Sequence, residues 1–143
     1  MSLLVQGMAR LLFLPSIVVA IAFCVKGSTG EGDGFSGGLV AGLAVALVLL
    51  GFGPHEARRI LPLRYAAAVA GVGFLIVVGT AVLPAILGAP PLQNRPPTGA
   101  QAVRLGAIGV NTALIFNTGI GALVAGGVSL VLARASNGSG RRR

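Results

Sequence analysis

Four long apolar stretches without a charged residue divide this chain of 143 residues. They cover residues 11–25, 35–53, 65–89 and 105–133. A helix that crosses the ~30 Å hydrocarbon core of a bilayer needs roughly 20 residues, since each adds about 1.5 Å. The first stretch reaches this length only if its helix extends back toward Leu3 across Gln6 and Arg10. The pattern therefore predicts an all-α membrane protein with four transmembrane helices, at about residues 4–26, 35–53, 65–89 and 107–133.

The composition supports this interpretation and argues against a soluble domain. Charged residues make up 10% of the chain, whereas a soluble domain carries about 25%. Segments of roughly ten residues with alternating polarity, typical of a membrane barrel, are not present either. We expect residues 1–135 to form one membrane domain, followed by a polar, basic cytoplasmic tail at residues 136–143.

The connection before the last apolar stretch limits where its helix can begin. Residues 90–104 contain four prolines, which cannot continue a membrane helix. The stretch that follows is several residues longer than one crossing requires. We expect it to start outside the hydrocarbon core, to tilt, or to break at Gly106 or Gly109.

The basic residues carry topology information. Lysine and arginine outnumber aspartate and glutamate by 11 to 3, but they are scattered between apolar stretches with few aromatic residues, which argues against nucleic acid as a partner. One side of the membrane receives Arg10, Arg58, Arg59, Arg64, Arg134 and Arg141 to Arg143, and the other receives Lys26, Arg95 and Arg104. Because basic residues favour the cytoplasmic side, we expect both termini in the cytoplasm.

Two of the three acidic residues, Glu31 and Asp33, lie in the glycine-rich stretch STGEGDGFSGGLVAG at residues 28–42. Asp33 and Ser36 are placed to cap the helix that follows, because the first N–H groups of a helix lack partners. The alternative is that both carboxylates attract cations at the outer mouth of this helix. The segment GDGFSG also matches a dinucleotide-binding fingerprint, but that fingerprint requires a preceding strand in a βαβ unit.

Glycine and small polar residues recur along the later predicted helices. Gly38 and Gly42, Gly71, Gly73 and Gly79, and Gly119, Gly121, Gly126 and Gly127 are expected to let helix backbones approach closely. Such a glycine-rich surface also suggests contact with other membrane subunits. Asn111, Thr112, Asn117 and Thr118 interrupt the last stretch. We expect each to hydrogen-bond another helix, with the lining of a hydrated ion path as the alternative.

The chain lacks the residue patterns of an enzyme or a metal site. No nucleophile with its base, carboxylate pair or phosphate-binding loop is recognisable. His55 has no partners at metal-ligand spacing, and Cys24, the single cysteine, lies inside an apolar run. No acidic or lysine side chain falls in the middle of a predicted helix, although a self-sufficient proton-coupled carrier usually needs one there. We therefore expect no enzyme activity and no cofactor.

Two motifs resemble those of the MnhB/MrpB family, the small B subunits of Mrp-type multisubunit cation/proton antiporters. The first is GDGFSGGLVAGLAVAL at residues 32–47, where the matching residues are Gly34, Phe35, Gly37, Gly38 and Leu39. The second is NTALIFNTGIGALVAGGVSLVL at residues 111–132, with Leu114, Phe116, Gly119 and Gly126 or Gly127 in place. Asn117 stands where the family usually has an aspartate, and residues 31–33 replace the family's proline-glycine-glycine entry.

The resemblance implies an accessory integral-membrane subunit of a multisubunit Na⁺/H⁺ antiporter in a bacterial cell membrane. It implies other membrane subunits as partners, Na⁺ and H⁺ as the transported ions, and a role in assembly or in lining part of the ion route. The candidate ion-path or helix-packing residues are Glu31, Asp33, Gly34, Phe35, Gly37, Gly38, Asn111, Thr112, Phe116, Asn117 and Gly119. The alternatives are a homologous subunit in the ion-pumping arm of a hydrogenase- or oxidoreductase-type complex, and a stand-alone dimeric exporter.

Overall fold

The computed structural model describes residues 3–26, 33–93, 95–96, 103–105 and 108–139. Its long helices are α1 (Leu3–Lys26), α2 (Gly34–Ile60), α3 (Ala66–Ile86) and α4 (Thr112–Ser139). Each of these four helices is long and apolar enough to cross a membrane. The predicted all-α membrane fold with four transmembrane helices is therefore confirmed, and the chain is a multi-pass membrane protein.

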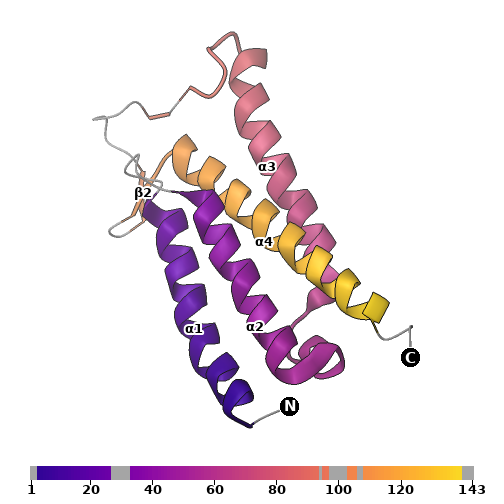
Figure 1. The fold of residues 1–143 in the computed structure, drawn as a ribbon. Helices are drawn as coiled ribbons and strands as arrows, with labels where there is room; N and C mark the ends of the chain where they lie inside the picture. The colour runs from indigo at the N-terminus through magenta and orange to yellow at the C-terminus, as the bar shows by residue number, and fades with distance from the viewer. Residues whose placement is uncertain (1–2, 27–32, 94, 97–102, 106–107, 140–143) are drawn as a thin grey trace.

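The helices lie side by side in the order α1, α2, α4, α3 (Figure 1). The last helix in the sequence, α4, packs between α2 and α3, while α1 packs mainly on α2. Two consecutive helices, α2 and α3, are thereby separated by a helix that follows both of them. This order makes α4 the central element of the bundle and brings residues near 34 next to residues near 117.

Most large apolar side chains face outward and few are enclosed. Leu3, Leu11 and Ile86 are 87%, 74% and 74% exposed, respectively. Lipid tails are as apolar as these side chains, so such exposure carries no hydrophobic penalty in a bilayer. The enclosed cluster lies where α2 bends and includes Val48, Leu49, Ala57 and Leu61.

Two helix boundaries differ from the predicted ones because of local backbone geometry. Helix α2 bends at Gly53, whose φ of 80° is accessible to glycine, and then continues through Pro54 to Ile60. The second apolar stretch does end at this bend, but the segment after it is helical instead of a loop. Helix α3 ends at Ile86 instead of residue 89, and Gly88 with φ 74° follows it in a typical helix-ending conformation.

The start of α4 also differs from the sequence-based expectation. Residues 103–105 and 108–110 form a two-stranded antiparallel hairpin, β1 (Val103–Leu105) and β2 (Ile108–Val110). Val103, Ile108 and Val110 are β-branched and favour strands, and α4 begins only at Thr112, five residues after the predicted start. The extra apolar length therefore lies outside the helix, whereas α4 extends at its other end to Ser139.

A short 3-10 turn, η2 (Leu63–Tyr65), joins the bent end of α2 to α3. Leu61, 9% exposed, packs into the enclosed cluster beside this turn and holds the connection against the bundle. The N-terminal end of α1, the bend of α2, the start of α3 and the C-terminal end of α4 all lie at the same end of the molecule (Figure 1).

Candidate functional site

The first turn of α2 is fixed by the carboxylate of Asp33. One Asp33 oxygen accepts a hydrogen bond from the backbone N–H of Ser36 at 3.0 Å, and the Ser36 hydroxyl donates to the other oxygen. The predicted cap at Asp33 is confirmed. These hydrogen bonds, that of the Ser36 hydroxyl first, hold the pKa of Asp33 below its usual value. Glu31, the other candidate carboxylate, lies outside the described residues.

Asn117 of α4 joins the two motifs. Its side-chain oxygen Oδ1 accepts a hydrogen bond of 3.3 Å from the backbone N–H of Gly34, 83 residues earlier in the chain. Gly34 is the first residue of α2, so its N–H has no partner within the helix. A side chain at position 34 would collide with the backbone carbonyl of Asn117, which explains why this contact needs glycine.

The next glycines of the first motif extend this contact to two neighbouring helices. A Cβ atom at Gly38 would lie 2.6 Å from the carbonyl oxygen of Gly121 on α4. A Cβ atom at Gly37 would lie 2.7 Å from the carbonyl oxygen of Ala20 on α1. Real Cβ contacts are not this short, so any larger residue at either position would push the helices apart. The start of α2 is thus wedged between α1 and α4.

We call this contact the motif junction and define it by Gly34, Gly37 and Gly38 of α2, Asn117 and Gly121 of α4, and Ala20 and Cys24 of α1. Sequence reasoning missed two of its members, Ala20 and Cys24. The sequence places Cys24 simply within an apolar run, but its Sγ lies 2.8 Å from a Cβ built on Gly121. The four-residue spacing of Gly34 with Gly38, and of Asn117 with Gly121, was the signal that could have paired the two helices.

The other candidate residues lie away from the motif junction or act within their own helix. Gly119 faces α3, where its Cβ would lie 2.7 Å from Cγ2 of Ile76. Phe35 is 56% exposed. Asn111 accepts a hydrogen bond of 2.8 Å from the N–H of Leu114 and so caps α4.

The hydroxyl groups of Thr112 and Thr118 in α4 have different kinds of hydrogen-bond partner. Thr112 binds the backbone of Arg95: its hydroxyl donates to the Arg95 carbonyl and accepts from the Arg95 N–H, both at 3.1 Å. The Thr118 hydroxyl donates to the Leu114 carbonyl at 2.8 Å within α4, so the prediction that it bonds another helix is wrong. Phe116 is half-buried. The Asn117 side chain reaches another helix, as expected.

An apolar groove of about 510 Å³ lies beside the motif junction, between α1, α2 and α4. Cys24 and Thr118 line it together with aliphatic residues such as Ile17, Ile21 and Leu114. Within the described part of the chain, no three His, Cys, Asp or Glu residues are grouped to hold a metal ion. The junction is therefore suited to packing helices, and its described side chains offer no carboxylate for proton or cation exchange.

The fold and the motif junction define a small, multi-pass helical membrane protein whose motif residues serve close helix packing. A family model described as "Domain related to MnhB subunit of Na+/H+ antiporter" matches residues 4–130. The chain belongs to this family. The membership predicted from the two motifs is thus confirmed.

Two bacterial relatives resemble the chain over most of its length. It is 31% identical over 125 residues to the B component of the Na(+)/H(+) antiporter of Bacillus subtilis (strain 168), and the match covers 87% of this chain and 85% of the relative. It is 32% identical over 124 residues to a protein of Staphylococcus aureus (strain Newman) named "Putative antiporter subunit mnhB2", covering 85% and 86% of the two chains.

Proposed function

We propose that this chain is an accessory subunit of a multisubunit Na⁺/H⁺ antiporter in a bacterial cell membrane. The observation that carries the proposal is the family match over residues 4–130, which includes the first motif, all but the last two residues of the second, and every residue of the motif junction. The names of the two relatives, both antiporter subunits, point to the same class of complex. They favour an antiporter over the hydrogenase-type assembly that the motifs alone leave open.

The chemistry of the four helices supports an accessory role. The acidic residue within the described helices is Glu56, which lies beyond the bend at Gly53, near one end of the bundle. Proton-coupled exchange requires a protonatable group inside the membrane. Larger subunits of the complex would supply that group, while this chain holds their helices in place and lines part of the ion route.

We also propose that both termini face the cytoplasm. The described basic residues Arg10, Arg58, Arg59, Arg64 and Arg134 lie in the helix segments that Figure 1 places at one end of the bundle. Lys26 and Arg95 belong to the opposite end, together with Asp33. An excess of arginine marks the cytoplasmic side of a membrane protein. In this orientation, the motif junction lies in the outer half of the membrane.

The test measures Na⁺-dependent collapse of a pH gradient in membrane vesicles that contain the whole antiporter complex. Deleting this subunit should abolish the exchange, and the wild-type gene should restore it. The double variant Glu31→Gln/Asp33→Asn should weaken exchange only modestly, because Asp33 lies at the edge of α2 and asparagine there still caps the helix. Full exchange without the subunit would refute the proposal.

A second measurement uses the purified chain alone in liposomes under an imposed pH gradient. We expect no Na⁺-dependent exchange, because the described residues of its helices hold no carboxylate in the membrane interior. Exchange by the isolated chain would show that it is a transporter in its own right and not an accessory subunit.

A further inference from the structure

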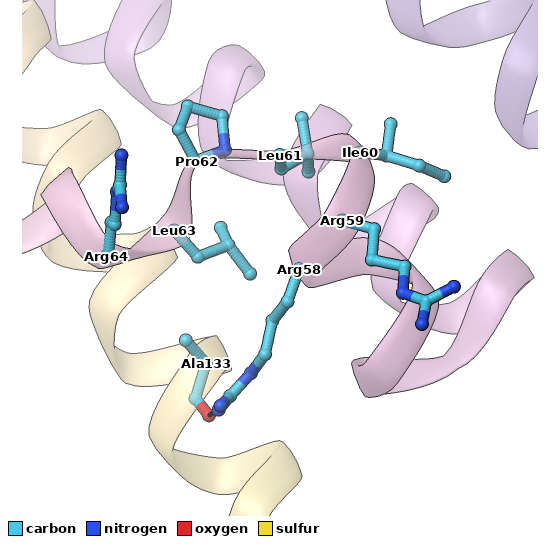
Figure 2. A pocket seen from close by; sticks show the side chains of 8 residues that line it. All are labelled: Arg58, Arg59, Ile60, Leu61, Pro62, Leu63, Arg64 and Ala133. Carbon is cyan, nitrogen blue, oxygen red and sulfur yellow. Dashed lines mark hydrogen bonds between the residues drawn. The ribbon is translucent and has the colours of Figure 1, made fainter.

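A second cavity of about 510 Å³ lies at the arginine-rich end of the bundle, at the turn between α2 and α3. It is lined by residues 58–64 and by Ala133 of α4 (Figure 2). Three of these eight residues are arginines, and Ile60, Leu61, Pro62 and Leu63 supply apolar walls. The lining of this cavity is therefore both cationic and aliphatic, whereas the lining of the groove beside the motif junction is almost entirely apolar.

The backbone that carries the arginines is held in place by the enclosed cluster of the fold. Ala57 is fully buried and Leu61 is 9% exposed, and both pack with Val48 and Leu49. Because Ala57 precedes Arg58 and Leu61 lies between Arg59 and Arg64, the three guanidinium groups extend from an anchored turn. An anchored turn loses little conformational freedom when a ligand binds.

Two of the arginines are positioned by neighbouring groups. Arg58 reaches across to α4, where its Nη2 donates to the carbonyl oxygen of Ala133 at 3.5 Å, as the orientation in Figure 2 shows. Arg64 lies over the ring of Tyr65 at 4.6 Å and donates to the Tyr65 hydroxyl at 2.7 Å. A guanidinium group has five N–H donors, so the contact with the Tyr65 hydroxyl leaves most of the donors of Arg64 for a ligand.

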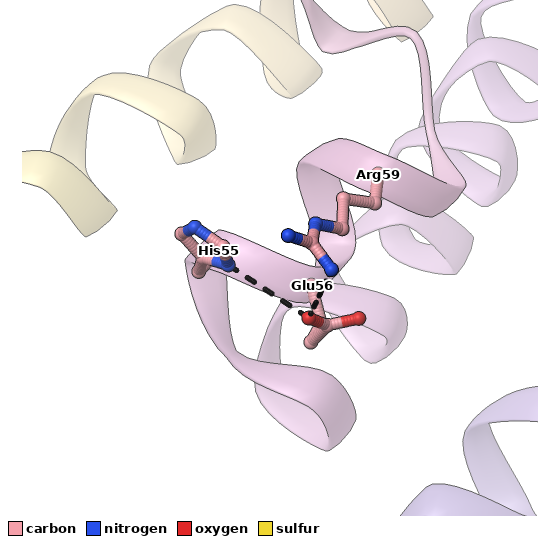
Figure 3. Close-up of polar contacts among 3 residues, drawn as sticks. All are labelled: His55, Glu56 and Arg59. Atoms are coloured by element: carbon pink, nitrogen blue, oxygen red, sulfur yellow. Dashed lines mark ion pairs between the residues drawn. The ribbon is translucent and has the colours of Figure 1, made fainter.

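The third arginine is paired only at the surface. Arg59 Nη1 lies 3.5 Å from Glu56 Oε1, and His55 Nδ1 lies 3.7 Å from the same oxygen (Figure 3). The side chains of Arg59 and Glu56 are 70% and 52% exposed, and such exposed pairs contribute little stability. Residues 55–64 thus carry three arginines and one glutamate, so the cavity has a net positive environment.

We propose that this cavity binds the headgroup phosphate of an anionic phospholipid. Arginine forms paired hydrogen bonds with phosphate oxygens, which suits Arg64, while Arg58 and Arg59 add positive charge to the same lining. Leu63 and Ile60, which is 50% exposed, suit the glycerol and the first methylene groups of the lipid. The cavity lies where transmembrane helices end, and Tyr65 beside it is 51% exposed, as is usual for tyrosine at a membrane interface. Basic cavities between helices at this depth suit anionic headgroups.

The apolar walls favour a lipid over a soluble phosphate, because inorganic phosphate would leave Leu63 and Ile60 uncovered. The inference does not depend on the antiporter assignment, since it rests on the local arrangement of residues 56–65 and Ala133. It can therefore fail while the proposed function stands, and the reverse also holds.

The test titrates the full chain in dodecylmaltoside micelles with dioleoylphosphatidylglycerol, with dioleoylphosphatidylcholine and with inorganic phosphate, and follows the melting temperature and the lipid retained in native mass spectrometry. We expect phosphatidylglycerol to bind and to raise the melting temperature, and the other two to have little effect. The variant Arg59→Gln/Arg64→Gln should weaken phosphatidylglycerol binding by roughly thirtyfold, given the contribution of each basic residue at a membrane surface.

This variant keeps the contact between Arg58 and Ala133, so the fold of the turn is retained. The matched control is Arg95→Gln/Arg134→Gln, which removes two exposed charges outside the cavity and should bind phosphatidylglycerol as the wild type does. Unchanged binding in Arg59→Gln/Arg64→Gln, an equal loss in the control, or equal stabilisation by inorganic phosphate would each overturn the proposal.

Discussion

Asn117 shows how one side-chain amide can join two helices without carrying a charge. Its Oδ1 accepts the N–H of Gly34, and an amide oxygen and a carboxylate oxygen are both acceptors. An asparagine at this position therefore supplies the acceptor without adding a titratable group. This explains how the fold of the motif junction remains intact when a group able to bind a proton is absent.

Two variants of Asn117 should separate the role of its acceptor oxygen from the role of a charge at this position. Asn117→Leu leaves the N–H of Gly34 without its acceptor in the membrane, and we expect a loss of about 1 kcal/mol in the free energy of unfolding. Asn117→Asp retains the acceptor and should unfold at nearly the wild-type midpoint. The measurement is unfolding of the chain in dodecylmaltoside by titration with SDS, followed by circular dichroism. Equal midpoints for Asn117→Leu and the wild type would contradict this role.

Asp33 gives a pH-dependent prediction. Its pKa in the folded protein is lowered from the usual 3.8 by the hydrogen bonds from Ser36. These hydrogen bonds stabilise the ionised carboxylate in the folded state and are absent in the unfolded state. The resulting stabilisation is fully present above the unfolded pKa and is lost as pH falls through the folded pKa. Wild type should therefore lose stability relative to Asp33→Asn only when the pH falls below about 4.

The measurement for Asp33 is the difference in melting temperature between wild type and Asp33→Asn at several pH values. Glu31, Glu56 and the chain terminus are common to both proteins, so their titration cancels in the difference. Asparagine caps helices about as well as aspartate, and the variant should fold normally. A difference that stays constant from about pH 6 to about pH 3 would show that the cap does not respond to its charge.

At the scale of elements, α4 uses different residues for its two neighbours. Gly119 and Gly126 are seven residues apart, two helical turns, and face α3. Asn117 and Gly121 face α2, together with Val128, which lies against Gly42. Small residues let two backbones approach, and close approach is a main source of helix association in lipid. This division explains how α4 can lie between two helices that precede it.

The neighbouring glycines of α4 offer a matched pair of variants. A Cβ atom at Gly126 would lie 2.5 Å from the backbone nitrogen of Ala70 and 2.7 Å from the carbonyl of Ala66, whereas one at Gly127 would meet nothing within 4 Å. Gly126→Ala should therefore cost about 1–3 kcal/mol through overpacking of α3 against α4. Gly127→Ala should be neutral or stabilising by up to about 1 kcal/mol, since alanine favours helices.

Both variants are compared with the wild type by the same SDS titration, and the change in chemistry is identical at the two positions. The structure predicts opposite signs for adjacent residues. Equal effects at the two positions would mean that α3 does not approach α4 as closely as described.

At the scale of the whole molecule, the two ends of the bundle differ in charge and in construction. The end that holds Asp33 also holds the β1–β2 hairpin, and there Thr112 of α4 is hydrogen-bonded to the backbone of Arg95. The other end holds the bend of α2 and the cavity of residues 58–64. The arginine excess at that second end is the basis of the proposed orientation.

Labelling of single cysteines tests the orientation. Starting from Cys24→Ala, His55→Cys places a thiol at one end of the bundle and Pro91→Cys at the other, both at exposed positions. In intact cells, a maleimide that cannot cross the membrane should label Pro91→Cys and should label His55→Cys only after the cells are broken. The reverse pattern would invert the proposed topology.

Several features follow from the sequence alone. Apolar length and the scarcity of charge determine four membrane helices, because an uncharged stretch of roughly 20 residues has few alternatives to crossing a bilayer. The cap at Asp33 also follows, because it depends on residues within one turn of each other. The family is indicated by two short motifs whose spacing can be read directly from the chain.

Other features are decided only by the tertiary structure, because they depend on which helices become neighbours. Apolar patterns do not encode the order α1, α2, α4, α3, so the contact between Gly34 and Asn117 cannot be read from either motif alone. The same holds for the different surroundings of Gly126 and Gly127, which are equivalent in sequence. Hydropathy sets how many helices cross the membrane, whereas close contact between particular backbones sets how those helices pack.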